Sequence, residues 1–385
     1  MKNIILLGAT GSIGSQVLEI VKDNCNYNVY GISFGNNIQR AKEIIEEFKP
    51  KIVCCKNAKD AYELEQLYQD IEFYVGDIGL QQLACVNVEN EIFINALVGY
   101  IGLLPTMTAI EYGKDVLLAN KETLVIAGEL VMNKAKEKGV KIIPIDSEHS
   151  AIFQLLEGKD ISDINRLIIT ASGGAFRDKT KEELEYVTKE DALKHPNWKM
   201  GPKITIDCAT MMNKGFELIE AYHLFNIDID HINPIIHRES IIHSMVEFND
   251  GVIFAQMGVS DMRVPIKYAL EYPSHSGLSL FNKLNLLEIK SLHFEEVSFE
   301  KYPLVKCAIE SIKKGKLQPT ILNAANEASV RLFLEDKIKF LDIEKNVIEA
   351  LNNSKYQSFN EGDISIPKII ALHELVYNDI YNKIN

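Results

Sequence analysis

Residues 4–14 read IILLGATGSIG, and this stretch decides the fold. The apolar run at 4–7 predicts a buried strand. Gly8, Gly11 and Gly14 then form the Gly-x-x-Gly-x-x-Gly variant of the dinucleotide-binding fingerprint. The first glycine permits the turn, the second lets the backbone approach a pyrophosphate, and the third lets the following helix pack on the strand. The amphipathic run at 17–21 predicts that helix, whose positive N-terminus would hold the phosphates. The sequence therefore predicts a nucleotide-binding domain, with an ordinary strand–helix turn as the alternative.

The turn after the second predicted strand indicates which nucleotide binds. Residues 29–33 form this strand, and the next residues, FGNN at 34–37, contain no acid. Asp or Glu there usually binds the 2′-hydroxyl of an NAD ribose. Amide donors and the nearby Arg40 suit a 2′-phosphate instead, so NADP is favoured. Arg40 is alternatively a solvated helix residue.

Composition excludes several classes of protein. The 385 residues are too many for one core, and a hydrophobic content of 46% argues against disorder. A net charge of −13 argues against nucleic acid as a partner. We find no apolar run near the ~20 residues of a membrane span and no signal peptide. The six cysteines lack metal-ligand spacing and suggest reduced thiols in the cytoplasm.

The pattern along the chain predicts an α/β fold with four parts. Residues 1–146 alternate strands and helices, which indicates a Rossmann-like, doubly wound parallel sheet. Its remaining strands are predicted at 52–55, 73–75, 92–96, 115–119 and 141–145. Residues 147–272 suggest an α+β catalytic domain, with strands at 166–170, 203–207 and 251–255. A linker at 273–298 and a helical domain at 299–385 complete the chain.

Acidic residues follow the strand predicted at 141–145. Asp146 and Glu148 are two residues apart, so an extended backbone would point both carboxylates the same way. Oxygen ligands suit Mg²⁺ or Mn²⁺ better than Zn²⁺. The alternative is a solvated acidic turn.

Two later segments suggest a phosphate site. Ser172 lies in the small-residue turn ASGG at 171–174, which follows a predicted strand. Asn213, Lys214 and Glu217 share one face of a helix expected after a strand and turn at 206–212. Lys214 and the amide suit a phosphate, although a plain glycine turn and a surface ion pair are the alternatives.

A punctuated polar segment at 194–202, KHPNWKMGP, holds the single tryptophan of the chain. An aromatic residue between prolines and a glycine is typical of a mobile lid. His195, beside Trp198, is expected to contact the substrate, with a surface histidine as the alternative.

Taken together, these motifs resemble the 1-deoxy-D-xylulose 5-phosphate reductoisomerase family. The matching segments, in order, are GATGSIG at 8–14, ANKE at 119–122, DSEHS at 146–150, ASGG at 171–174, HPNW at 195–198, ATMMNKG at 209–215 and IHSMV at 242–246. The similarity runs from residue 1 to about 380.

The resemblance implies an NADPH domain, a catalytic domain with a lid, a C-terminal helical domain and a homodimer. It implies Asp146, Glu148 and Glu217 as ligands of Mg²⁺ or Mn²⁺, with Co²⁺ also possible. The catalytic residues implied are Lys121, Glu148, His195 and Lys214. The substrate-binding residues implied are Lys121, Ser147, Glu148, Ser172, His195, Trp198, Cys208, Asn213, Lys214 and Glu217. The cofactor-binding residues implied are Gly8, Thr10, Gly11, Ser12, Ile13, Gly14, Gly35, Asn36, Asn37, Asn120, Glu122 and Gly201.

The chain departs from the family pattern at two places. Cys208 stands where the family usually has Ser, whose hydroxyl helps to hold the phosphate, and a thiol is a weaker donor. His237-Arg238-Glu239-Ser240 replaces His-Pro-Gln-Ser and adds an ion pair near the edge of the site.

The family reaction is the rearrangement of the sugar phosphate 1-deoxy-D-xylulose 5-phosphate to a branched aldehyde, then hydride reduction to 2-C-methyl-D-erythritol 4-phosphate. It is a committed step of non-mevalonate isoprenoid biosynthesis. A semialdehyde dehydrogenase with Cys208 as nucleophile is one alternative, but it needs no carboxylate cluster. A non-catalytic NADP sensor is another, but it has no use for a metal-and-phosphate site.

Overall fold

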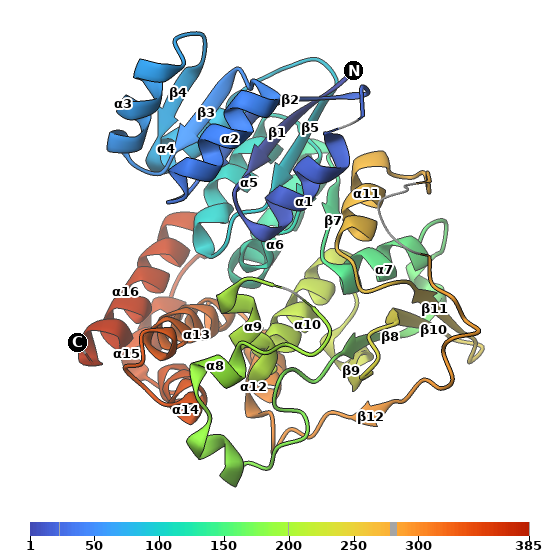
Figure 1. Cartoon of the computed structure of the whole chain (residues 1–385). Helices are drawn as coiled ribbons and strands as arrows, with labels where there is room; N and C mark the ends of the chain where they lie inside the picture. Colours follow the sequence, from blue (N-terminus) through green and yellow to red (C-terminus); the bar gives the residue numbers. More distant parts are fainter. Residues whose placement is uncertain (23, 199, 278–282, 385) are drawn as a thin grey trace. The chain divides into compact units, whose positions relative to one another are not determined.

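The computed structural model describes residues 1–22, 24–198, 200–277 and 283–384. They form two compact units, whose elements Figure 1 labels. The first unit comprises Met1–Thr123, Glu129–Ser150 and Asp261–Phe281, and the second Leu124–Gly128, Ala151–Ser260 and Asn282–Asn385. Lys199 of the predicted lid and residues 278–282 of the predicted linker lie outside the described residues. Among the described helices, every one is too short or too polar to cross a membrane.

The first unit is built on a seven-stranded parallel sheet, which confirms the predicted doubly wound fold. Its strand order is β4-β3-β2-β1-β5-β6-β7. The strands are β1 (Lys2–Leu7), β2 (Tyr27–Phe34), β3 (Ile52–Cys55), β4 (Glu72–Val75), β5 (Glu91–Asn95), β6 (Val116–Leu118) and β7 (Ile142–Pro144). The chain leaves β1 toward β4 and then returns to β5, so the crevice for ligands is expected beside the carboxyl ends of β1 and β5.

Helices connect and cover these strands, with α1 packing on α11 and α4 on α5. They are α1 (Ser12–Val21), α2 (Ile38–Phe48), α3 (Ala58–Leu67), α4 (Gly76–Cys85), α5 (Leu103–Glu111), α6 (Lys121–Lys138) and α11 (Arg263–Glu271). Helix α6 is bent at Ala127, whose backbone angles are not helical. The α7 helix (Ser147–Leu155) begins in the first unit and ends in the second.

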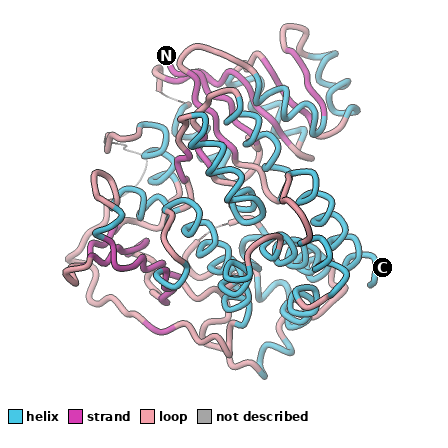
Figure 2. The backbone as a smooth tube through the Cα atoms, turned by 180° about the vertical axis from the view of Figure 1, so that it is seen from behind, coloured by secondary structure: helices cyan, strands magenta, loops and turns pink. Residues whose placement is uncertain are grey.

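The second unit contains a five-stranded mixed sheet in the order β11-β10-β8-β9-β12. Its strands, magenta in Figure 2, are β8 (Ile164–Ala171), β9 (Ile232–Ile236), β10 (Ile242–Phe248), β11 (Ile253–Met257) and β12 (Glu295–Glu296). Apolar residues of β8, such as Leu167 and Ile169, form one buried core with Leu218 and Ala221 of α10. The sheet thereby fixes the helix that carries Asn213, Lys214 and Glu217.

The helices of this unit are α8 (Lys189–Ala192), α9 (Pro202–Ala209), α10 (Met212–Phe225), α12 (Pro303–Lys314), α13 (Gln318–Leu334), α14 (Phe340–Leu351), α15 (Ser354–Gln357) and α16 (Ile366–Ile384). The helical character predicted after residue 299 is therefore confirmed. Helix α13 packs against α9, α12, α14 and α16, and its buried face is unusually polar.

The strand predicted at 203–207 is wrong, because these residues belong to helix α9. Alternating Ile204 and Ile206 suggested a strand, but Pro202 occupies the first turn, where proline favours a helix start. The Thr205 hydroxyl also donates to the Gly201 carbonyl oxygen at 2.8 Å, which satisfies an acceptor beside the helix start. The strand expected at 251–255 is present but lies two residues later, as β11.

Candidate functional site

In the first unit, a lysine and an aspartate follow neighbouring strands. Lys121 begins α6 just after β6, and Asp146 follows β7, which pairs in parallel with β6. The carboxyl ends of both strands therefore meet at one edge, and Lys121 Nζ lies 3.0 Å from Asp146 Oδ2. Lys121 is buried, so this ion pair is shielded from water.

The extended spacing predicted for Asp146 and Glu148 is wrong. Helix α7 begins at Ser147, and the Ser150 amide donates to the Asp146 carbonyl oxygen at 2.8 Å. Asp146 thus stands at the helix start and Glu148 in its first turn, where the positive end of the helix dipole favours carboxylates. These residues form a helix rather than an extended segment because SEHSAIFQL at 147–155 has helical rather than alternating periodicity.

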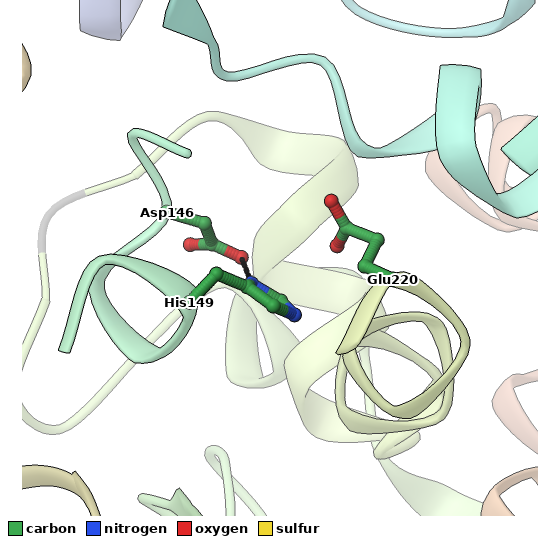
Figure 3. Close-up of side chains that lie close together, drawn as sticks. All are labelled: Asp146, His149 and Glu220. Atoms are coloured by element: carbon green, nitrogen blue, oxygen red, sulfur yellow. Dashed lines mark ion pairs between the residues drawn. The ribbon is translucent and has the colours of Figure 1, made fainter. Parts of the chain in front are cut away.

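A histidine that sequence analysis gave no role supports Asp146. His149 is fully buried on α7, and its Nδ1 lies 3.5 Å from Asp146 Oδ2. Figure 3 shows the two side chains turned toward each other. Figure 3 also draws Glu220 of α10. The three-residue spacing of Asp146 and His149 at a helix start is the signal that could have identified this contact.

The charge state of Asp146 follows from these neighbours. Burial alone raises the pKa of this carboxyl, but the Lys121 ammonium and the His149 hydrogen bond outweigh burial. They hold the pKa of Asp146 well below its usual range. Asp146 is therefore a carboxylate at neutral pH.

The glycine turn between β1 and α1 has the shape that the fingerprint predicts. Gly8 has a φ of +83°, and an added Cβ would lie 2.5 Å from the Ala96 carbonyl oxygen. A Cβ on Gly14 would lie 2.3 Å from the Gly8 carbonyl oxygen. The Ser33 hydroxyl, at the carboxyl half of β2, accepts from the Gly8 amide at 2.9 Å. The turn is thus pressed against β5 and α1, and side chains at either glycine would disrupt it.

Other residues assigned to the cofactor have structural contacts as well. Asn37 caps α2 by accepting from the Arg40 amide, and Arg40 pairs with Glu43 on the helix surface. Buried Asn120 caps α6 and donates to the Leu97 and Gly99 carbonyl oxygens. Asn120 therefore fastens the loop after β5 to the start of α6.

In the second unit, Ser172 and His195 meet. Ser172 Oγ lies 3.0 Å from His195 Nε2, although 23 residues separate them. The amides of Asn197 and Trp198 donate to His195 Nδ1, which makes Nδ1 the acceptor and leaves the proton on Nε2. His195 therefore presents an N–H group beside the Ser172 hydroxyl, an arrangement that suits an anion.

Asn213, Lys214 and Glu217 lie together on α10, as predicted, although buried rather than solvated. The Asn213 amide and the Lys214 ammonium both donate to the Glu217 carboxylate. Only 3% of Lys214 and 1% of Glu217 are exposed, which argues against a surface ion pair. Met211, with a φ of +60°, turns the chain from α9 into α10.

Cys208 lies at the end of α9, half-buried, beside the Ser172 turn. Gly174 has a φ of +69°, and an added Cβ would lie 2.3 Å from the Cys208 carbonyl oxygen. The turn and the end of α9 are therefore in close backbone contact.

The segment around Trp198 is fastened at Asn197, which sequence analysis gave no role. Its side-chain amide donates to the Arg238 carbonyl oxygen at 2.7 Å and to the Ser240 hydroxyl at 2.6 Å. The Trp198 ring lies 6.0 Å from the ring of His243, centroid to centroid. Arg238 and Glu239, at which we expected a departure from the family pattern, form separate ion pairs: the Arg238 guanidinium with Asp178 and Glu295, and Glu239 with His293.

The first unit thus contains the glycine turn and the carboxylates of Asp146 and Glu148. The second contains the contact between Ser172 and His195 and the cluster of Asn213, Lys214 and Glu217.

Comparisons with known proteins agree on the family. A model described as 1-deoxy-D-xylulose 5-phosphate reductoisomerase matches residues 4–128, and models of its C-terminal domains match 142–225 and 257–377. The chain is 53% identical to the 1-deoxy-D-xylulose 5-phosphate reductoisomerase of Bacillus subtilis, over 91% of this chain and 92% of the relative. It is 50% identical to that of Listeria innocua, over 91% and 93%.

Solved structures give the same result. A crystal structure of DOX-P reductoisomerase in complex with NADPH, fosmidomycin and magnesium has a TM-score of 0.95 and 36% identity, covering 100% of this chain and 98% of that one. The Zymomonas mobilis enzyme in complex with NADPH has a TM-score of 0.89 and 36% identity, covering 100% and 99%. The chain belongs to the 1-deoxy-D-xylulose 5-phosphate reductoisomerase family.

Proposed function

We propose that the residues described above carry out the reaction of this family, the NADPH- and divalent-metal-dependent conversion of 1-deoxy-D-xylulose 5-phosphate to 2-C-methyl-D-erythritol 4-phosphate. The observation that carries the assignment is the buried contact between Lys214 and Glu217. One helix there holds a cation suited to phosphate and a carboxylate suited to a metal. A sugar phosphate, with a phosphate at one end and neighbouring oxygens at the other, needs both.

We assign NADPH to the first unit. The Gly8 and Gly14 backbones leave no room for a Cβ, as a pyrophosphate cradle requires, and α1 directs its N-terminus at the turn. The residues from Gly35 to Asn37 include no acid that would repel a 2′-phosphate. When bound, NADPH supplies the hydride that reduces the aldehyde.

We assign Mg²⁺ or Mn²⁺ to Asp146, Glu148 and Glu217. Asp146 is held ionised by its neighbours. Glu217 is buried and accepts hydrogen bonds from Asn213 and Lys214. Both carboxylates therefore suit a hard cation as oxygen ligands. When bound, the cation acts as a Lewis acid on the substrate oxygens during the carbon–carbon rearrangement. Lys121 holds Asp146 in place and offers its ammonium at the same edge of the sheet.

We assign the phosphate group to the second unit. Ser172, His195, Asn213 and Lys214 supply hydroxyl, imidazole and cationic donors, with Cys208 beside them. Contacts to this remote group orient the substrate without taking part in bond making. Trp198 and the segment fastened by Asn197 exclude water from the reacting carbons.

NADPH oxidation on addition of 1-deoxy-D-xylulose 5-phosphate, followed by absorbance, tests this function. Turnover is expected with Mg²⁺ or Mn²⁺ and none after chelation. A rate of NADPH oxidation that does not change when the sugar phosphate is added would contradict the assignment.

We further propose that the enzyme is a cytoplasmic homodimer with the four-part division predicted from the sequence. The six cysteines, all within the described residues, form no disulfide, which suits a reducing compartment. Edge strand β11 exposes Ile253, Phe254 and Met257, and an apolar edge strand favours pairing with another copy. Phe254→Asp should shift the mass measured by light scattering toward the monomer. The control, Leu67→Asp at an exposed site in the first unit, should not.

A further inference from the structure

A buried carboxylate in the second unit has no role in the chemistry described above. Asp207 of α9 is 2% exposed, and each of its oxygens accepts from a different element. Asn326 Nδ2 of α13 donates to Oδ1 at 2.7 Å, and Lys203 Nζ of α9 donates to Oδ2 at 2.9 Å. Asn326 is completely buried, and 119 residues separate it from Asp207 in the sequence. The contact therefore joins the C-terminal helices to α9.

The end of α9 determines the position of both segments proposed to bind phosphate. Its Cys208 carbonyl oxygen packs against Gly174 of the Ser172 turn so closely that a Cβ has no room. The same oxygen accepts from the Met211 amide at 3.2 Å, immediately before α10 and its Asn213 and Lys214. A shift of α9 would move the Ser172 turn and the start of α10 together.

We propose that Asn326 is a positioning residue for the phosphate end of the substrate. It holds the Asp207 carboxylate, and through α9 it holds Cys208, the Ser172 turn and Lys214 in one arrangement. This inference rests on the proposed phosphate site. The C-terminal helices would then contribute indirectly to substrate binding, although Asn326 itself does not contact the substrate.

The buried negative charge of Asp207 explains why the hydrogen bond from Asn326 is needed. A buried carboxylate is strongly destabilised when it loses a hydrogen-bond donor, because water cannot replace that donor. Asp207 would then move toward water or toward Lys203, and α9 would follow. An amide at position 326 satisfies the carboxylate without adding a second charge.

Asn326→Leu tests the proposal, with Asn323→Leu as the matched control. Asn323 lies one turn earlier on α13, is also completely buried, and contacts His373 on α16 rather than Asp207. We expect Asn326→Leu to raise the KM for the sugar phosphate about tenfold, the effect of losing one good hydrogen bond to a charged group. The kcat should change less than about threefold, and the KM for NADPH should not change. The control should lose comparable thermal stability and keep both KM values.

A second readout uses inorganic phosphate as the probe, with Trp198 emission reporting its binding. The Kd for phosphate should weaken by the same factor in Asn326→Leu and stay constant in the control. If Asn326→Leu does not fold, Lys203→Met removes the other donor to Asp207 and should produce the same pattern.

Unchanged substrate KM and phosphate Kd in a folded Asn326→Leu or Lys203→Met variant would overturn the proposal, as would equal changes in the control. Failure of the wild type to convert the sugar phosphate would instead contradict the proposed reaction. The phosphate titration would still decide the role of Asn326.

Discussion

Lys121 Nζ and Asp146 Oδ2 lie 3.0 Å apart, although 25 residues separate them along the chain. The two residues follow β6 and β7, so the parallel pairing of these strands sets their distance. The pair keeps a half-buried carboxylate ionised and fixed in direction. As the metal ligand that we propose, Asp146 would bind a cation without first losing a proton.

The first prediction is metal dependence through Glu217. Glu217→Gln keeps the shape of the side chain but removes the charge, so kcat should fall about 100-fold or more. The Kd for NADPH should not change, because the glycine turn lies in the other unit. Steady-state kinetics and NADPH fluorescence titration measure the two quantities. Glu349→Gln, at an exposed site, is the control, and full activity in the presence of EDTA would refute the prediction.

The second prediction concerns the segment that carries Trp198. Because Trp198 is the only tryptophan, its emission reports on that segment alone. Addition of a phosphonate mimic of the substrate with Mg²⁺ should shift the emission to shorter wavelength as the ring leaves water. The assignment of a lid fails if the spectrum stays constant at saturating ligand.

The third prediction concerns the choice of cofactor. With no acid from Phe34 to Asn37, NADPH should exceed NADH in kcat/KM by at least about tenfold. Placing an acid there, by Asn36→Asp, should reduce that preference because it repels the 2′-phosphate. Initial rates with both cofactors measure the ratio, and equal efficiency in the wild type would contradict our interpretation of the turn.

The fourth prediction concerns Cys208, which replaces the usual serine. Cys208→Ser should lower the KM for the sugar phosphate about 2- to 10-fold at similar kcat, because a hydroxyl donates better than a thiol. A small alkylating reagent should inactivate the wild type, and bound substrate should protect it. If KM stays constant and alkylation spares activity, Cys208 serves only in packing.

The fifth prediction is a loss of stability in acid through His223. Burial lowers the pKa of His223 to about 4, below the 6.5 of an unperturbed histidine. As the pH falls below 6.5, His223 becomes protonated in the unfolded chain, whereas in the folded chain it stays neutral until about pH 4. The free energy of unfolding therefore decreases between these two pH values. The full effect is at most about 3 kcal/mol.

Urea unfolding at about pH 7.5 and about pH 5 would show this loss. His223→Leu removes the titration, so its stability should fall less between the two values. Equal losses in both proteins would exclude His223 as the cause.

Much of the fold could be predicted because its signals are local. The glycines of the first turn, the apolar strands from β1 to β7 and the helical C-terminal part are all visible in short windows. Residues 203–207 were wrongly predicted as a strand because Ile204 and Ile206 give the alternating apolar pattern of a strand. The proline that starts α9 lies just outside that window.

The candidate site was harder to predict from the sequence, because its contacts join segments that are far apart in the chain. Residue types made Asp146, Ser172 and Lys214 candidates, but no spacing indicates that Asn326 meets Asp207 across 119 residues. Burial could not be predicted either: a Lys and a Glu on one helix usually face solvent, whereas Lys214 and Glu217 are covered by the packing of α10.

The close contact between Gly174 and the Cys208 carbonyl oxygen has a consequence for inhibitor design. Two backbones without a side chain between them cannot be spread apart by a rotamer change, so the phosphate site that we propose there would have little adaptability. A bulkier acid in place of a phosphate or phosphonate should be rejected there.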